Sequence, residues 1–187
     1  MSGDLRDVLR ALPGFPPSLP ELSVEEAPED PTVLFRRWLN DAIAEGSRQP
    51  HAFDLLTLRP DGAPVGRVLI VKEIDGRGVH FSTHESSRKG AHLAANPVAS
   101  MLFFWRESGR SVRLTGTVDS LSDEESARDW EQRPNYDGAP NPDWRLYALA
   151  PTEAEFMQAR EDRRHVRVEY LLGADGWSRG HVTTPAG

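Results

Sequence analysis

Residues 51–84 read HAFDLLTLRPDGAPVGRVLIVKEIDGRGVHFSTH, and this stretch decides the fold. Apolar and polar residues alternate within it in three runs, which is the period of a β-strand with one buried face. The dipeptide Asp-Gly occurs at 61–62 and again at 75–76, and Asp-Gly between apolar runs favours a tight hairpin. The stretch therefore predicts three consecutive antiparallel strands.

Helices and further strands are predicted on both sides of this stretch. Asp30 can cap a helix and Pro31 suits its first position, while Leu34, Trp38 and Ala42 recur at helical spacing to about residue 45. The remaining predicted elements are helices over 86–96 and 122–133 and strands over 98–105, 111–121, 154–158, 163–172 and 176–182.

Antiparallel strands with few helices predict an α+β domain built on a small β-barrel. The sequence contains no parallel βαβ repeat and no glycine-rich phosphate motif. Residues 1–29 contain five prolines and predict an irregular N-terminal arm with a short helix around Leu5–Leu12. The chain of 187 residues suffices for one domain, which we assign to residues 30–187, and is too short to suggest two.

Composition limits the classes of function. The net charge is −7, which argues against a nucleic-acid partner, and the absence of cysteine excludes disulfides and thiolate catalysis. The sequence shows no membrane span and no secretory signal, so we expect a cytoplasmic protein. The histidines lack metal-ligand spacing, so we expect no metal site.

Residues 81–90, FSTHESSRKG, combine four hydroxyls with two cations. Arg88 and Lys89 would open a helix, whose free backbone amides favour an anion. In RVLIVK, residues 67–72, alternation places Arg67 and Lys72 on opposite faces of a strand, and the hairpin predicts that one of them lies beside Ser82-Thr83. The alternative is a buried strand with charged ends followed by a solvated turn. We favour a phosphate site because the cations cluster in an acidic protein.

Residues 163–170, RRHVRVEY, form a second candidate site. As a strand, this segment would place Arg163, His165, Arg167 and Glu169 on one face. That face is either an exposed charged surface or a wall that contacts an anionic, planar ligand, and the pattern alone leaves both open.

The runs RVLIVK, VHFSTHESSRKGAHLAANPVASMLFFW and RRHVRVEY, in this order, resemble the pyridoxamine 5′-phosphate oxidase family. The resemblance covers about residues 30–182 and is most marked to the phenazine-biosynthesis branch, where an FSTH run followed by an NP-x-AS run is familiar. It implies an antiparallel split β-barrel with a few flanking helices. It also implies a homodimer with FMN at the interface.

The resemblance also implies roles for individual residues. Arg163 and His165 match an Arg-x-His pair that faces the substrate over the flavin ring. Ser111 and Met157 stand where the family has a glutamine from the partner subunit and a tryptophan near the flavin. The implied cofactor-binding residues are Arg67, Val68, Leu69, Ile70, Val71, Lys72, Ser82, Thr83, Arg88, Lys89, Ser111, Met157 and Arg167.

Departures from the family pattern concern the substrate. Members that oxidise pyridoxine phosphate grip its phosphate with a lysine, a tyrosine, an arginine and a serine. Here Lys72 and Arg133 remain, but Asp129 and Asp137 replace the other two, and a carboxylate near a phosphate is repulsive by roughly 1 kcal/mol or more. Arg133, four residues after Asp129, is expected to pair with it. The implied substrate-binding residues are therefore Lys72, Asp129, Arg133, Asp137, Arg163 and His165.

Two further segments depart from the family. Residues 134–144 are shorter than usual, and the end of the chain, HVTTPAG, lacks the common Arg-Leu-x-Pro. We expect FMN to be kept and the substrate to have changed.

The leading hypothesis is an FMN-dependent oxidase of specialised metabolism. A reduced cyclic or aromatic amine, phenazine-like, would pass a hydride to FMN, and dioxygen would become hydrogen peroxide. The alternatives are a pyridoxine/pyridoxamine 5′-phosphate oxidase and a non-catalytic flavin-binding protein. Deazaflavin F420 in place of FMN is a further possibility within this barrel superfamily.

Overall fold

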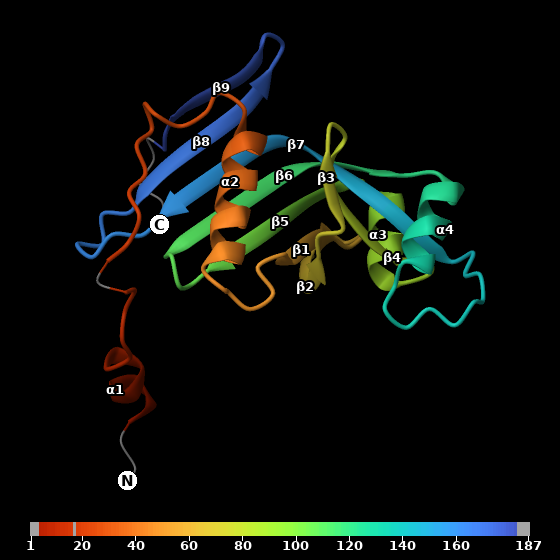
Figure 1. Ribbon diagram of the computed structural model, residues 1–187, viewed down its shortest axis with the longest axis horizontal. Coiled ribbons are helices and arrows are strands. Elements are labelled where there is room, and N and C mark those ends of the chain that lie inside the picture. The colour runs from red at the N-terminus through yellow and green to blue at the C-terminus, as the bar shows by residue number, and fades with distance from the viewer. Residues whose placement is uncertain (1–3, 17, 183–187) are drawn as a thin grey trace.

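The computed structural model describes residues 4–16 and 18–182. Figure 1 shows a strongly curved sheet, one long helix packed across its concave face and an N-terminal arm that extends away from the body. Most of the unusual C-terminal HVTTPAG segment lies outside the described residues. No helix within residues 4–16 and 18–182 is both long and apolar enough to cross a membrane.

The sheet is antiparallel between all neighbouring strands, as the sequence predicted. Its order is β2-β1-β5-β6-β7-β4-β3, and β8 and β9 extend from β7. The strands are β1 (Ala52–Leu58), β2 (Pro64–Ile70), β3 (Glu73–Asp75), β4 (Gly78–His84), β5 (Val98–Trp105), β6 (Arg110–Ser120), β7 (Trp144–Gln158), β8 (Val166–Gly173) and β9 (Gly176–His181).

Both predicted Asp-Gly hairpins are present. Of the two cations expected beside Ser82-Thr83, it is Lys72 that lies along β4, where its amide donates to the carbonyl of His80 at 2.8 Å. The turns join β1 to β2 and β3 to β4, and Gly62 and Gly78 take φ values of 83° and 121° that favour glycine. However, β2 pairs with β1, whereas β4 pairs with β3 and β7. Arg67 is therefore not a cross-strand neighbour of Ser82-Thr83, because the chain leaves β2 at Ile70 and starts a new edge of the sheet.

Strand β7 is much longer than the predicted 154–158. It spans 15 residues, with β4 and then β8 along one edge and β6 along the other. Pro151 in its middle weakens the strand signal, since proline cannot donate to a β ladder. The register of β6 against β7 shifts between Thr115 and Gly116, and this bulge accommodates the proline.

Helix α2 (Pro31–Ala44) packs on the concave face of the sheet (Figure 1). Asp30 caps it by accepting a hydrogen bond from the amide of Thr32 at 2.7 Å. Its buried side chains, Phe35 and Trp38 among them, contact core aromatics of the sheet at ring-centre distances of 4.9 Å to Phe103 and 5.3 Å to Phe156. Each such buried large side chain stabilises the fold by roughly 1.5–3 kcal/mol.

The convex face of the sheet stays open. In β5, Met101, Phe103 and Trp105 are buried, whereas Leu102 and Phe104 between them are 41% and 50% exposed. Val68 on β2 is 71% exposed on the same face, because β1 places Asp54 opposite both Val68 and Leu102. This face carries several of the candidate site residues.

The N-terminal arm contains the short helix α1 (Leu5–Arg10), which buries no residue. Residues 11–16 and 18–30 are irregular apart from turns, and Val24 and Ala27 are buried. The hydroxyl of Tyr170 on β8 donates to the carbonyl of Pro28 at 2.7 Å, which fixes the end of the arm on the sheet.

Candidate active site

A cleft of about 650 Å³ lies where β2 meets the start of helix α3 (Arg88–Ala95). Arg67, Arg88 and Lys89 line it together with Ser87 and His92. Because these cations share one concave wall, we call this region the cationic cleft. Arg67 thus reaches the FSTHESSRKG segment at its helix, and not across the sheet.

The side chain of Arg67 is oriented by β1. Its Nη1 donates to the carbonyl of Leu55 at 2.9 Å and to Oγ1 of Thr57 at 2.7 Å. Oγ1 of Thr57 also lies 3.0 Å from Nδ1 of His92, which is buried in α3. Sequence reasoning missed Thr57 and His92, since both depend on packing between elements distant in the chain.

Burial and mutual repulsion disfavour the charged forms of the cations in the cleft. Burial lowers the pKa of Arg67, and Arg88 lowers it further, while Asp54 acts in the opposite direction. Burial also lowers the pKa of Lys89, with a further contribution from Arg67. An anion that enters the cleft would stabilise the charged forms of these side chains, because an opposite charge counteracts the effects of burial and repulsion.

The beginning of α3 supplies hydrogen-bond donors to the same region. Ser87 caps the helix by accepting from the amide of Gly90 at 3.2 Å, within the range 86–96 in which the sequence predicted a helix. Oγ of Ser82 is buried without a hydrogen-bond partner among residues 4–16 and 18–182, and Oγ1 of Thr83 lies 3.4 Å from Oγ of Ser87. Cations, hydroxyls and helix amides are what a phosphate requires, so the donor set fits the phosphate of FMN.

Three other candidates form one row on the convex face. Ser111 on β6 pairs in register with Met157 on β7, which pairs with Arg167 on β8. The row continues to Phe104 on β5, opposite Ser111. Arg167 lies 3.9 Å from Glu155, which also binds Arg113 at 3.1 Å. The row is separated from β2 by β1 and β5.

Arg163 and His165 do not lie on a strand, so their predicted strand face shared with Arg167 is wrong. Strand β8 begins at Val166, and Arg160–His165 form a turn in which Asp162 accepts from the amide of Arg164 at 2.9 Å. An aspartate that binds its own backbone two residues on favours such a turn over a strand.

The turn fixes both side chains. Arg163 takes a φ of 62°, a conformation rare for residues other than glycine, asparagine and aspartate. Nδ1 of His165 accepts a hydrogen bond from the amide of Arg160 at 3.0 Å. In the neutral imidazole the proton therefore sits on Nε2, which can donate to a ligand.

Phe15 of the N-terminal arm joins these groups. Its ring meets those of His165 and Phe104 edge-on, at centre distances of 6.0 and 6.3 Å. Sequence reasoning missed Phe15 and Phe104, because the arm has no periodic signal and an exposed aromatic residue in a strand has no distinctive pattern. Together they form an aromatic border around His165.

Among the candidate substrate residues, Asp129 pairs with Lys72 and not with Arg133 as expected. Nζ of Lys72 lies 3.6 Å from Oδ1 of Asp129 in helix α4 (Asp123–Glu131), and the Trp144 indole donates to Oδ2 at 2.7 Å. The predicted Asp129–Arg133 pair is wrong because α4 ends before Arg133, whose guanidinium instead covers the rings of Trp130 and Trp144 at 4.4 and 4.6 Å.

Asp137 lies in the exposed loop that follows α4. Its Oδ1 accepts from the amide of Ala139 at 3.0 Å, so this carboxylate stabilises the turn of the loop. Among the remaining cofactor candidates, Val68 and Ile70 project from the convex face, Leu69 packs against the core, and Val71 follows the end of β2.

Comparison with known proteins identifies the family. Residues 39–158 match the family described as pyridoxamine 5′-phosphate oxidase, and residues 144–182 match the C-terminal dimerisation region of pyridoxine 5′-phosphate oxidase. The second match supports the predicted homodimer.

Individual proteins agree with this assignment. A pyridoxine/pyridoxamine 5′-phosphate oxidase from Microcystis aeruginosa is 34% identical, over 87% of this chain and 92% of the relative. One from Thermosynechococcus vestitus is 35% identical, over 82% and 89%. The crystal structure of PhzG from Burkholderia lata, in complex with tetrahydrophenazine-1-carboxylic acid, is 30% identical with a TM-score of 0.82, over 88% of this chain and 98% of that chain.

These similarities confirm the expected fold and chemistry. The antiparallel sheet with few helices is the split β-barrel, and FMN is the cofactor. The chain belongs to the pyridoxamine 5′-phosphate oxidase family and is an FMN-dependent oxidase.

Proposed function

We propose that this oxidase acts in specialised metabolism on a reduced cyclic or aromatic amine, phenazine-like, and not on pyridoxine phosphate. The observation that carries the proposal is the pairing of Lys72 with Asp129. An ammonium already neutralised by a carboxylate offers little attraction to a substrate phosphate, and Asp129 itself repels one.

Arg133, the second cation expected to bind a substrate phosphate, also contacts groups of this chain. Arg133 lies over both Trp130 and Trp144, where its charge interacts with the aromatic faces. Asp137, which replaces a serine of the phosphate grip, adds a carboxylate to the same segment of the chain. The two cations expected to hold a substrate phosphate are thus both occupied by groups of this chain.

The relative PhzG supports the proposed class of substrate. Its structure contains tetrahydrophenazine-1-carboxylic acid, a reduced tricyclic amine. The aromatic border of Phe15 and Phe104 next to His165 would suit a planar ring of this kind, since aromatic pairs prefer edge-on and offset contacts.

The residues of this chain divide the work. Arg67, Arg88 and Lys89 in the cationic cleft would hold the phosphate of FMN, and the convex-face row would border its ring. Bound FMN would supply the redox chemistry, namely acceptance of a hydride from the substrate and reduction of dioxygen to hydrogen peroxide. His165, through its Nε2–H, would orient the substrate, and Arg163 would stabilise negative charge beside it.

The test compares two substrates on the FMN-loaded protein. Tetrahydrophenazine-1-carboxylic acid should bleach the flavin absorbance without oxygen and yield hydrogen peroxide with oxygen. Pyridoxine 5′-phosphate should do so at least tenfold more slowly. A faster reaction with pyridoxine 5′-phosphate would overturn the proposal.

The second candidate is a pyridoxine/pyridoxamine 5′-phosphate oxidase. The names of several relatives that are 34–35% identical favour it, as does the retention of Lys72 and Arg133. The same experiment decides between the two, because the candidates predict opposite orders of rate.

A further inference from the structure

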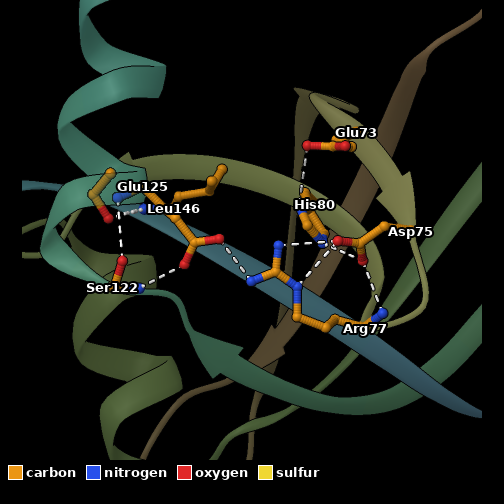
Figure 2. Close-up of polar contacts among 8 residues, drawn as sticks. Glu73, Asp75, Arg77, His80, Ser122, Glu125 and Leu146 are labelled. Atoms are coloured by element: carbon orange, nitrogen blue, oxygen red, sulfur yellow. Dashed lines mark hydrogen bonds and ion pairs between the residues drawn. The ribbon is translucent and has the colours of Figure 1, made fainter.

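A cavity of about 390 Å³ lies between the β3–β4 hairpin, β7 and α4. Glu73, His80 and Leu146 line it from the sheet, and Arg128 and Asp129 from α4. Figure 2 shows His80 between two carboxylates of the hairpin, with Arg77 reaching across to Glu125 of α4. None of the roles assigned above uses His80.

One nitrogen of His80 has an assigned partner. The side chain is completely buried, and its Nε2 lies 2.9 Å from Oδ1 of Asp75. Burial tends to raise the pKa of Asp75, but the amide and guanidinium of Arg77, together with His80, lower it overall. Asp75 is therefore an ionised acceptor, so the contact requires a proton on Nε2 of His80.

The other nitrogen lacks a partner. Neutral imidazole with a proton on Nε2 carries a lone pair on Nδ1, and this atom has no hydrogen bond to any residue of 4–16 and 18–182. Oε2 of Glu73 lies 4.0 Å away, too far for a hydrogen bond. His80 and Glu73 both line the cavity, and the carboxylate of Glu73 lies on the Nδ1 side of the ring. A buried acceptor left unpaired is unfavourable, which favours a donor at this point.

The charged group nearest to Nδ1 of His80 favours a cationic donor. Lys72 is paired with Asp129 at 3.6 Å, and Arg77 is paired with Asp75 and Glu125 at 2.9 and 2.7 Å. Neither Glu73 nor Arg128 forms an ion pair with a lysine, arginine, aspartate or glutamate within the described part of the chain. Of these two lining residues it is Glu73, with its side chain 66% exposed, that lies beside Nδ1 of His80. An acceptor nitrogen beside such a carboxylate is complementary to an ammonium group.

We propose that this cavity binds the amine group of a small organic molecule, whose N–H donates to Nδ1 of His80 while Glu73 supplies the opposite charge. That the amine belongs to the substrate rests on the proposed function. Lys72 lines the cavity and belongs to the segment that the resemblance places along the flavin, so the two sites adjoin. A substrate could then have its amine under α4 and its reacting carbon over the flavin.

The direct test observes the imidazole nitrogens of the FMN-loaded protein by ¹⁵N NMR. Before any addition, Nδ1 of His80 should show the resonance of an unprotonated nitrogen. Cyclohexylamine, a cation at neutral pH, should shift this resonance saturably, whereas cyclohexanecarboxylate, of the same shape and opposite charge, should not. A protonated Nδ1, or a resonance that cyclohexylamine leaves unchanged, would overturn the inference.

Variants separate the two contacts. His80→Gln can keep a donor toward Asp75 while it removes the Nδ1 acceptor, and it should weaken cyclohexylamine binding at least tenfold, as measured by calorimetry. Glu73→Gln should weaken it severalfold and, as a surface substitution, should fold even if His80→Gln does not. Glu124→Gln, on the exposed side of α4, is the matched control and should bind normally. Normal binding by Glu73→Gln would contradict the proposed countercharge.

The test of amine binding at His80 can fail or succeed independently of the test of the proposed function. Oxidation of tetrahydrophenazine-1-carboxylic acid without any effect of cyclohexylamine on His80 would overturn this inference alone. Amine binding at His80 without flavin reduction by that substrate would support the inference and contradict the proposed function.

Discussion

The ammonium of Lys72 lies 3.6 Å from one oxygen of Asp129, and the other oxygen of that carboxylate accepts a hydrogen bond from Trp144 at 2.7 Å. The pair joins the end of β2 to α4 and the start of β7. It removes the charge of the lysine from the site in which the family resemblance expects a substrate phosphate. If the proposed function holds, the preference for one substrate class depends on this one carboxylate.

Asp129→Asn should restore affinity for a phosphorylated substrate. Asparagine keeps an acceptor for Trp144 but loses the charge, so Lys72 becomes available. The pair is partly exposed, which limits the effect to about 1 kcal/mol, or about fivefold in KM for pyridoxine 5′-phosphate. Steady-state kinetics measure it, with Glu131→Gln as the control. An unchanged KM would show that Lys72 does not contact the phosphate.

Arg88→Ala and Lys89→Ala should each weaken FMN binding. A charge-assisted hydrogen bond contributes about 1.5–3 kcal/mol, which corresponds to roughly 10- to 100-fold in Kd. Quenching of flavin fluorescence measures the affinity, and salt should lower it more in the parent protein than in either variant. Arg10→Ala in the exposed helix α1 is the control. FMN affinity equal to that of the control would contradict the assignment of the cleft.

FMN affinity should also depend on alkaline pH through Lys89. Burial and Arg67 lower the pKa of this lysine in the free protein, and a bound phosphate should raise it again. Since only the charged form attracts phosphate, affinity should be full at neutral pH and fall as pH rises through the lowered pKa, before the ordinary lysine range near 10.5. In Lys89→Met this fall should disappear, and its persistence there would contradict the argument.

Arg163→Gly and Arg163→Ala should affect stability differently. The φ of 62° costs a side-chain-bearing residue about 1 kcal/mol, and glycine adopts it freely. The glycine variant should therefore melt about 2–4 °C above the alanine variant in calorimetry. Both variants should lose oxidase activity to a similar extent, because both lack the guanidinium. Equal melting temperatures would show that the turn relaxes in solution.

Gly116→Ala should destabilise the sheet. A Cβ at this position would lie 1.9 Å from the carbonyl oxygen of Ala150 in β7, so the bulge would have to open. Overpacking of this kind typically costs about 1–3 kcal/mol, measurable by urea unfolding. Gly14→Ala in the arm, where a Cβ meets nothing within 4 Å, is the control. Equal unfolding midpoints would contradict the close approach.

The features that the sequence predicts well have local causes. The two Asp-Gly hairpins and the cap Asp30 follow from residues a few positions apart, and the structure has all three. The first half of β7 was missed because Pro151 obscures it, although a bulge in β7 itself, with Thr152 as the extra residue, accommodates the proline.

The candidate site was less predictable, because it depends on contacts between distant segments. Thr57 orients Arg67, Asp129 engages Lys72, and Phe15 reaches His165 over 150 positions along the chain. Helical spacing suggested an Asp129–Arg133 pair, but the helix ends before Arg133. The identity of the site residues came from resemblance to a family, whereas their actual partners could be seen only in three dimensions.

The bulge between β6 and β7 has a consequence for the evolution of this protein. Side chains of a strand alternate between faces, so loss of one residue from β7 beyond Pro151 would invert every later position. Met157 would turn into the core and Gln158 toward the convex face. Insertions and deletions should therefore be tolerated in the loop before Trp144 but selected against in the strand itself. The chain can then diversify at one end of β7 while the end that carries Met157 stays in register.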